Sequence, residues 1–320
     1  MHAGMVIAAL SHFVKKMNIY TIIVEPCDSG RRLDRFLMDF ATLSNLGLSR
    51  TAIQNLMALN FVTVNGRPVT KTNHKVVPGQ QITLEVGDPK VAPALVAENI
   101  PLEVVYEDDD LAIVNKPGGL VVHPAPGNAL HTLVQALMHR FKTLSDVNPL
   151  RPGIVHRLDK ETSGLMVIAK NNKAHHALAK QFADHTMKKK YVALVKGKVE
   201  YDENIIDLSI GRHPTKREHM AVGTGVNARF AKTHYRTLKR TDKLSLLELE
   251  PYTGRTHQLR VHLSYIGHPI MGDSKYGKQV AFPRMALHAK YLGFIHPSSG
   301  EFVEFETKIP KVFTGALKGT

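Results

Sequence analysis

Residues Ile154 to Lys170 read IVHRLDKETSGLMVIAK and form the most informative segment of the chain. A charged, turn-rich segment, residues 156–164, lies between two apolar runs with the character of strands, so we expect a loop held by rigid flanks. Within this loop Arg157 and Lys160 flank Asp159, and nearby cations favour the charged form of a carboxylate. Asp159 is therefore a candidate reactive anion, although Asp residues in turns more often bind local backbone amides.

The whole chain bounds the classes of protein to consider. Its 320 residues are too many for one ordinary core and predict two or three domains. The formal net charge of +14 indicates a polyanionic partner, nucleic acid before a membrane surface. The early apolar run Met5 to Leu10 is too short to span a bilayer, and the single cysteine, Cys27, fits a reducing compartment. We therefore expect a soluble, cytoplasmic protein that does not use a membrane.

The sequence offers no convincing site for a metal or a nucleotide cofactor. His257 and His262 are five residues apart, but the carboxylates and thiols that a zinc site needs are missing nearby. No glycine-rich phosphate loop follows a strand, and no G-x-S-x-G nucleophile motif is present. We expect no metal and no cofactor, which leaves a reaction centred on a carboxylate as the economical enzyme hypothesis.

Residues 18–88 have the pattern of a small domain with two helices and a few strands, preceded by a poorly specified extension, residues 1–17. Apolar residues at helical spacing mark the two helices: Leu33, Phe36, Leu37 and Phe40, then Ile53, Leu56 and Met57. Ser49 is a suitable N-cap for the second helix, and the pair Asn65-Gly66 predicts a tight hairpin turn. Alternation of Ile82, Leu84 and Val86 predicts a closing strand.

After a linker at residues 89–101, the larger domain covers residues 102–320. We expect strands at 102–106, 111–114, 120–122 and 188–195, and helices at 133–141 and 172–187. Mixed helices and strands without regular βα alternation predict an α+β fold.

Two further segments bear on chemistry. Lys188 to Tyr191 places an aromatic ring beside three ammonium groups, a combination suited to RNA, although Tyr191 at the start of an apolar strand would ordinarily belong to the core. Residues 251–263 open with a turn and continue at helical spacing, with Arg260 off the apolar stripe. The spacing leaves open whether Arg260 points toward a carboxylate or into water.

Four segments, in order, resemble the motifs of the RluA family of RNA pseudouridine synthases: VNKPGGLVVHP at 114–124, HRLDKETSGLMVIAK at 156–170, KKYVALVKG at 189–197 and PYTGRTHQLRVHL at 251–263. The front domain resembles the S4 RNA-binding domain through RRLDR at 31–35, SR at 49–50 and VNGRPV at 64–69. The resemblance covers nearly the whole chain from about residue 20, and it leaves residues 1–17 without a counterpart. HPAPGN at 123–128 and GRHPTKREHMAV at 211–222 are most similar to members that modify a stem-loop of large-subunit ribosomal RNA.

The resemblance implies a fold and an activity. The fold is an α+β catalytic domain, with a mixed, largely antiparallel sheet, flanking helices and a central cleft, preceded by a small S4-like α/β domain. The activity is the cofactor-free isomerisation of uridine to pseudouridine in large-subunit (23S) ribosomal RNA, free or in an assembling or assembled subunit. A monomer is expected. The alternatives are a non-catalytic RNA-binding ribosome assembly factor and a methyltransferase that carries an S4 domain.

The same resemblance implies roles for particular residues. Asp159 attacks a flipped-out uridine, either at the sugar or by the proton removal that makes a glycal. Tyr191 stacks on the uracil near its C5 proton, and Arg260 pairs with Asp159. Arg157 fills the space that the flipped nucleotide leaves. The implied RNA contacts are Arg157, Arg255, Lys188, Lys189, Lys190, Arg32, Arg35, Arg50 and Arg67.

Overall fold

The computed structural model describes residues 17–44, 46, 48–58, 60–87, 95–124, 128, 130–216, 219–223, 228–277 and 282–318. The chain divides into two compact units, Met1–Leu95 and Val96–Thr320. The predicted N-terminal extension, apart from Met17, and residues 89–94 of the predicted linker lie outside the described residues.

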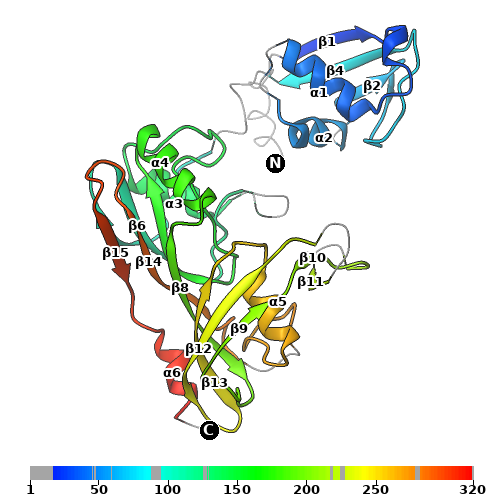
Figure 1. The fold of residues 1–320 in the computed structure, drawn as a ribbon. Coiled ribbons are helices and arrows are strands. Elements are labelled where there is room, and N and C mark those ends of the chain that lie inside the picture. The colour runs from blue at the N-terminus through cyan, green and yellow to red at the C-terminus, as the bar shows by residue number, and fades with distance from the viewer. Residues whose placement is uncertain are drawn as a thin grey trace, which may run out of the picture. The chain divides into compact units, whose positions relative to one another are not determined.

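The small unit packs two helices against a four-stranded antiparallel sheet (Figure 1). In sheet order the strands are β1 (Met17–Ile23), β4 (Gln81–Gly87), β2 (Val62–Val64) and β3 (Arg67–Pro68). A short 3-10 helix, η1 (Pro26–Asp28), follows β1, and the helices are α1 (Leu33–Leu43) and α2 (Arg50–Ala58). The predicted helices, hairpin and closing strand are confirmed, whereas strand β1 was not predicted.

Local chemistry explains two of these elements. The Ser49 hydroxyl oxygen accepts the amide proton of Ala52 at 3.2 Å and so caps α2, as predicted. Asn65 and Gly66 have φ angles of 49° and 74°, the left-handed conformation that a two-residue hairpin turn requires.

The large unit is built on a nine-stranded sheet. Its main path is β5 (Glu103–Glu107), β6 (Leu111–Lys116), β7 (Ser163–Ala169), β14 (Leu287–Ile295), β8 (Lys188–Lys196), β13 (Leu244–Pro251), β12 (Lys232–Arg240) and β9 (Glu203–Asp207), and β15 (Phe302–Glu306) pairs with β14. Among the described strand pairs of this sheet, β7 with β14 is parallel and the others are antiparallel. The predicted α+β fold with a mixed, largely antiparallel sheet is confirmed.

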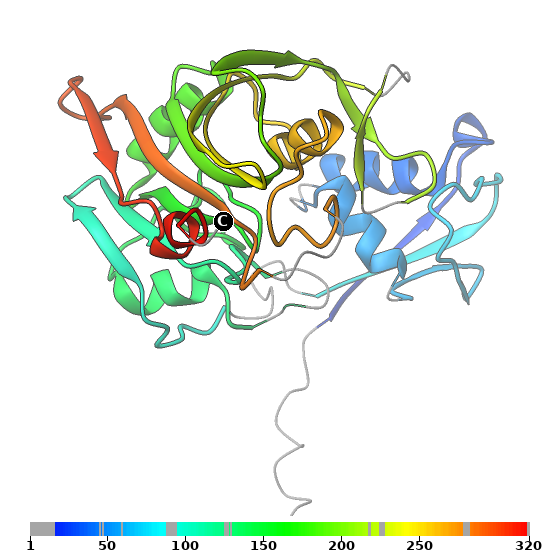
Figure 2. The same ribbon diagram turned by 90° about the horizontal axis from the view of Figure 1, so that it is seen from below.

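Helices cover the two halves of this sheet. The helices are α3 (Leu133–Arg140), α4 (Asn172–Ala183), α5 (Gln258–Tyr265) and α6 (Lys311–Ala316). Helix α4 packs on β6 and β7 through Ala174 and Leu178, whereas α5 and α6 pack on the half that contains β8 and β13. Figure 2 shows the strands of this second half curving around α5. A separate hairpin, β10 (Ile210–Arg212) and β11 (Met220–Val222), lies near α5 (Figure 1).

Two element predictions in the large unit are wrong. The helix predicted at 172–187 ends at Ala183, because His185 has a φ of 57° and the Thr186 amide donates back to the Gln181 carbonyl. The strand predicted at 120–122 is a single bridge between Val121 and Thr132. The carbonyl groups of Val121 and Val122 instead accept amide protons from the first turn of α3.

Candidate active site

The loop that carries Asp159 is a fixed turn directly before β7. The Asp159 carbonyl accepts the Thr162 amide proton at 3.1 Å, and the next carbonyl, that of Lys160, accepts the Gly119 amide proton at 2.9 Å. The Lys116 ammonium also donates to the Lys160 carbonyl, at 3.0 Å. Hydrogen bonds therefore join the two segments with the family motifs, residues 114–124 and 156–170. They fix the backbone next to Asp159.

Lys116 itself is fully buried and makes no ion pair among the described residues. Its ammonium donates to three carbonyl oxygens, those of Pro117, Leu120 and Lys160, each at 2.9 or 3.0 Å. Burial lowers its pKa to about 8, against the opposing charges of Glu161 and Asp159. Three hydrogen bonds to carbonyl groups thus take the place of a counterion under the loop.

A close backbone approach holds the other end of the loop. Gly164 has a φ of 117°, and a Cβ atom there would lie 2.2 Å from the carbonyl oxygen of Ala289. This contact belongs to the short parallel pairing of β7 with β14, in which Ser163 faces His288 and Gly164 faces Ala289. Only glycine allows this approach, so the residue five positions after Asp159 fixes how the loop meets β14.

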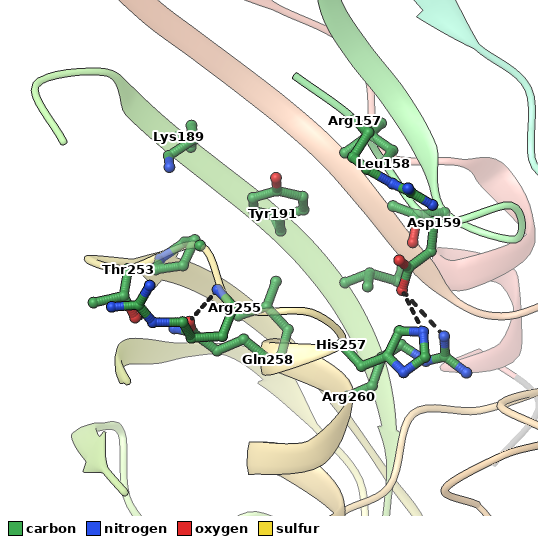
Figure 3. Close-up of a pocket in the computed structure, with 15 residues that line it drawn as sticks. Arg157, Leu158, Asp159, Lys189, Tyr191, Thr253, Arg255, His257, Gln258 and Arg260 are labelled. Atoms are coloured by element: carbon green, nitrogen blue, oxygen red, sulfur yellow. Dashed lines mark hydrogen bonds and ion pairs between the residues drawn. The ribbon is translucent and has the colours of Figure 1, made fainter. Parts of the chain in front are cut away.

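The Asp159 side chain lies against the guanidinium of Arg260, as Figure 3 shows. Arg260 Nη1 donates to Asp159 Oδ2 at 3.1 Å, while its Nε and Nη2 donate to Asp273 at 2.8 and 2.9 Å. Of the two orientations that spacing left open for Arg260, the structure therefore has the one toward a carboxylate. Arg260 is a bridge, because its planar group contacts two acidic side chains at once.

Burial would lower the pKa of Arg260, but its contacts with Asp273 and Asp159 raise that pKa above its ordinary value. Burial would likewise raise the pKa of Asp273, but hydrogen bonds and the charge of Arg260 lower it below its ordinary value. Asp273 is buried, and its Oδ1 also accepts the amide protons of Lys275 and Tyr276. Arg260 and Asp273 are therefore both charged, and the cationic guanidinium of Arg260 lies beside Asp159.

Sequence reasoning missed Asp273 as well as His257. The Nε2 atom of His257 is 3.8 Å from Asp159 Oδ2, and its Nδ1 is 2.7 Å from the Tyr276 hydroxyl. Burial lowers the pKa of His257 more than the charge of Asp159 raises it, so its ring is neutral at neutral pH. Of these two residues, the sequence carried a usable signal for Asp273 only. Asp273 precedes Lys275 by two residues in a segment flanked by glycines, and an Asp there is typical of a turn in which the carboxylate accepts backbone amide protons.

These residues line one pocket, formed by the Asp159 loop, by β8 and by residues 251–260. Of the predicted site residues it contains Arg157, Asp159, Lys189, Tyr191, Arg255 and Arg260. Tyr191 is partly buried there, and burial together with the charge of Asp159 raises the pKa of its phenol to about 12. Its hydroxyl group therefore stays protonated at neutral pH, and its ring is a surface on which a base can stack.

The other two lysines of the predicted run lie elsewhere. The Lys188 ammonium lies 5.1 Å from the centre of the Phe302 ring, and that of Lys190 lies 3.8 Å from Glu248. Neither residue lines the pocket. Their predicted contact with RNA stays a prediction.

In the small unit, two of the four predicted arginines contact a buried acid. Asp34 is fully buried and accepts hydrogen bonds from Arg32 at 3.0 Å, Arg50 at 2.8 Å and Gln54 at 3.2 Å. The hydrogen bonds from Arg32 lower the pKa of Asp34 well below its ordinary range, with Arg50 and Gln54 adding to the effect. Arg35 and Arg67, by contrast, are exposed.

The described residues contain no cluster of three or more His, Cys, Asp or Glu side chains suited to a metal ion. Among the described helices, none combines the length and apolar character that crossing a membrane requires.

Comparison with known proteins identifies the class. The family profile described as RNA pseudouridylate synthase matches residues 110–265. An uncharacterized RNA pseudouridine synthase of Bacillus subtilis is 45% identical over 298 residues, which cover 92% of this chain and 96% of that protein. The ribosomal large subunit pseudouridine synthase D of Zymomonas mobilis is 42% identical over 295 residues, covering 88% and 91%.

A solved structure gives the same result. The human RNA pseudouridylate synthase domain containing 1 matches with a TM-score of 0.57 and 31% identity, covering 67% of this chain and 86% of that one. The fold, the pocket and these matches define an enzyme that modifies RNA. The chain belongs to the RNA pseudouridine synthase family.

Proposed function

We propose that this enzyme isomerises uridine in large-subunit ribosomal RNA, with Asp159 as the reacting carboxylate. The observation that supports this role is the position of Asp159 in the pocket, where buried Arg260 holds one of its oxygens and the ring of Tyr191 lines the same pocket. The substrate class follows from several relatives that are named ribosomal large subunit pseudouridine synthase D and are 37–42% identical to this chain.

The two oxygens of the Asp159 carboxylate have different surroundings. Both the Arg260 hydrogen bond and the His257 contact involve Asp159 Oδ2. Within the described residues Oδ1 has no side-chain donor, so it is the oxygen available to the nucleotide. One oxygen fixes the orientation of the group while the other reacts, which is the arrangement that a nucleophilic carboxylate needs.

The reaction moves one bond and exchanges one proton. The N1–C1′ bond of uridine breaks and its electron pair stays on the uracil. Asp159 either bonds to C1′ or removes the 2′ proton to leave a glycal. The uracil then turns and its C5 bonds to C1′; at this step the Asp159–C1′ bond breaks in the first route, or the 2′ proton returns from Asp159 to C2′ in the second. The C5 proton leaves and N1 gains a proton. Because reactant and product are isomers, the chain needs to orient and hold the intermediates rather than supply a group.

Several residues support the remaining roles. Tyr191 offers a neutral aromatic face for the uracil, which suits stacking. Arg157 and Arg255 line the same pocket, where cations can contact phosphates or occupy the space that an extruded base leaves, a step that costs a few kcal/mol. We also propose that the small unit makes further contacts with the RNA. The enzyme works as a monomer in the cytoplasm in this proposal.

Tritium release tests the proposal. Large-subunit ribosomal RNA labelled at C5 of uridine is incubated with the wild-type protein and with Asp159→Asn. We expect the wild type to release tritium and the variant to release none above background. Release by Asp159→Asn at the wild-type rate would overturn the role of Asp159. An inactive wild-type protein that still binds the RNA would instead support the assembly-factor alternative. Mapping pseudouridines in RNA from cells without the gene identifies the target positions.

A further inference from the structure

Lys189 lies in the pocket, apart from its two lysine neighbours. Successive side chains of a strand point to opposite faces, so Lys189 and Tyr191 of β8 share one face and Lys188 and Lys190 share the other. The contacts agree, because Lys189 and Tyr191 line the pocket whereas Lys190 lies near Glu248. Of the three lysines, Lys189 alone is therefore on the face of β8 that meets the pocket.

Among the described residues the Lys189 ammonium makes no ion pair with a carboxylate, and it lies 5.9 Å from the centre of the Phe182 ring. The side chain is partly buried, and burial lowers its pKa because no negative charge offsets the loss of water. An incompletely paired cation at the wall of a reaction pocket is suited to negative charge that forms there during the reaction.

Its position relative to Asp159 indicates which charge that is. In Figure 3 Lys189 and Asp159 lie on opposite sides of the Tyr191 ring. A uracil stacked on Tyr191, with its ribose at Asp159, directs the carbonyl opposite its glycosidic bond away from Asp159 and toward Lys189. In uridine that carbonyl oxygen is O4, since C4 lies across the ring from N1.

We propose that Lys189 is a catalytic residue whose ammonium donates a hydrogen bond to this carbonyl oxygen and stabilises the uracil anion released when the N1–C1′ bond breaks. The electron pair of that bond passes to N1 and spreads over the ring to O4, so the negative charge grows at the oxygen nearest Lys189. The inference rests on the proposed function, because it assumes that uridine reacts in this pocket.

The same contact also serves the product. Turning the ring by half a revolution about its N3–C6 axis exchanges N1 with C5 and O4 with O2. The carbonyl across the ring from the sugar is therefore O4 before the turn and O2 after it. One ammonium group at this end of the pocket can hold the detached base in both orientations, which keeps it from leaving between the two steps.

The test compares Lys189→Met with the wild type under single-turnover conditions, on an RNA fragment whose target uridine has been mapped with the wild-type protein. Loss of one donor to a developing oxyanion predicts a rate lower by about 10²–10³-fold, with nearly unchanged RNA affinity. Lys189→Gln, which keeps a neutral donor, should fall between the two. Lys198→Met is the matched control, because Lys198 is an exposed lysine paired with Asp242, outside the pocket. Thermal unfolding confirms that each variant is folded.

A substrate change locates the contact. Placing 4-thiouridine at the target position replaces O4 by sulfur, a weaker hydrogen-bond acceptor. The rate ratio of wild type to Lys189→Met should then shrink at least about tenfold, corresponding to loss of a hydrogen bond of about 1.4 kcal/mol or more.

Two outcomes overturn the inference while the wild type is active: an equal ratio on both substrates, or weaker RNA binding with an unchanged rate at saturation, which describes a phosphate contact. An inactive wild type overturns the proposed function instead.

Discussion

At the scale of single residues, the orientation of Asp159 depends on a second acid, Asp273, which contacts Arg260 and does not line the pocket. Asp273 is buried and holds two of the donor nitrogens of Arg260, which leaves Nη1 directed at Asp159. The contacts that orient the Asp159 carboxylate therefore run from a turn at Asp273 through Arg260 of α5 to the loop before β7. This is why the orientation of Asp159 was not evident from the residues next to it in sequence.

Asp273→Asn tests this dependence. The amide removes the charge that balances buried Arg260 and one of its acceptors, and breaking a buried pair in this way costs about 3–5 kcal/mol. We expect a lower free energy of unfolding and a fall in kcat that exceeds the change in KM, since Arg260 no longer holds Asp159. Chemical denaturation and tritium release measure the two effects. Asp242→Asn, at an exposed ion pair, is the control, and wild-type kcat in Asp273→Asn would contradict the bridge.

Tyr191 leads to a prediction about pH. Burial and Asp159 raise the pKa of its phenol to about 12, so the hydroxyl group remains protonated throughout the range from about pH 6 to about pH 10. The rate in that range should contain no rising limb from Tyr191. The pH profiles of wild type and Tyr191→Phe should accordingly have the same shape, whatever their difference in height. A limb that rises with pH in the wild type and is missing from Tyr191→Phe would show a phenolate acting as a base.

At the scale of elements, β7 and β14 fix the loop that carries Asp159 through a contact that excludes any side chain at Gly164. In Gly164→Ala the new Cβ would lie 2.2 Å from the Ala289 carbonyl oxygen, and the φ of 117° strains any L residue. We expect a loss of more than about 3 kcal/mol of stability, or failure to fold. Gly66→Ala is the matched control, because Gly66 also has a positive φ but a Cβ there meets nothing within 4 Å. Equal midpoints of denaturation for both variants would refute the close approach.

The same two strands contain a buried histidine that makes stability depend on pH. Arg284 donates to the Ser163 hydroxyl, which lies 2.8 Å from His288 Nδ1, and His288 Nε2 lies 2.7 Å from the Thr307 hydroxyl. Burial, with the charges of Arg284 and Lys290, lowers the pKa of His288 from 6.5 to about 4. Between these two pH values His288 is protonated in the unfolded chain and neutral in the folded chain. The free energy of unfolding therefore falls as the pH drops from about 6.5 to about 4.

The size of this loss is about 3–4 kcal/mol, because one pKa unit corresponds to about 1.4 kcal/mol. Urea unfolding of wild type and His288→Asn across that pH range measures it. The advantage of the wild type should be full near neutral pH and shrink as the solution becomes acidic. A difference that stays constant with pH would show that His288 does not titrate between the two states.

The elements also show what the sequence could predict. Helices with a clear apolar period, such as α1 and α2, were predicted because local chemistry decides them, and for α2 the Ser49 cap was a further signal. Strand β1 was missed because its pairing partner β4 lies about sixty residues away and the decisive contacts are long-range. The end of α4 was missed because His185, rather than a glycine, adopts the left-handed conformation that stops the helix.

The active site divides in the same way. Asp159, Tyr191 and Arg260 were predicted through motifs, since each lies in a segment with a recognisable pattern, and all three line one pocket. Asp273 and the distinct direction of Lys189 were not found. The first comes from a turn that only the fold brings to Arg260, and the second depends on which face of β8 meets the pocket.

At the scale of the whole molecule, a net charge of +14 predicts binding that depends strongly on salt. Each RNA phosphate that meets a lysine or arginine releases bound counterions, so the logarithm of the association constant should fall linearly with the logarithm of salt concentration. Arg35 and Arg67 are exposed arginines of the small unit that lack an ion pair within the described residues. They are the best candidates there for phosphate contacts, because Arg32 and Arg50 are engaged by Asp34.

The variant Arg35→Ala with Arg67→Ala should therefore weaken RNA binding at low salt and reduce the magnitude of the salt slope by about 2, one for each lost phosphate contact. The single-turnover rate at saturating RNA should stay at the wild-type value, because neither residue lines the pocket of Asp159. Lys198→Ala removes one positive charge from an exposed ion pair and controls for net charge alone. Fluorescence anisotropy over a series of salt concentrations gives both slopes. Parallel lines for the double variant and the wild type would mean that the small unit binds RNA through other residues, or that the basic charge of the chain does not act through these two arginines.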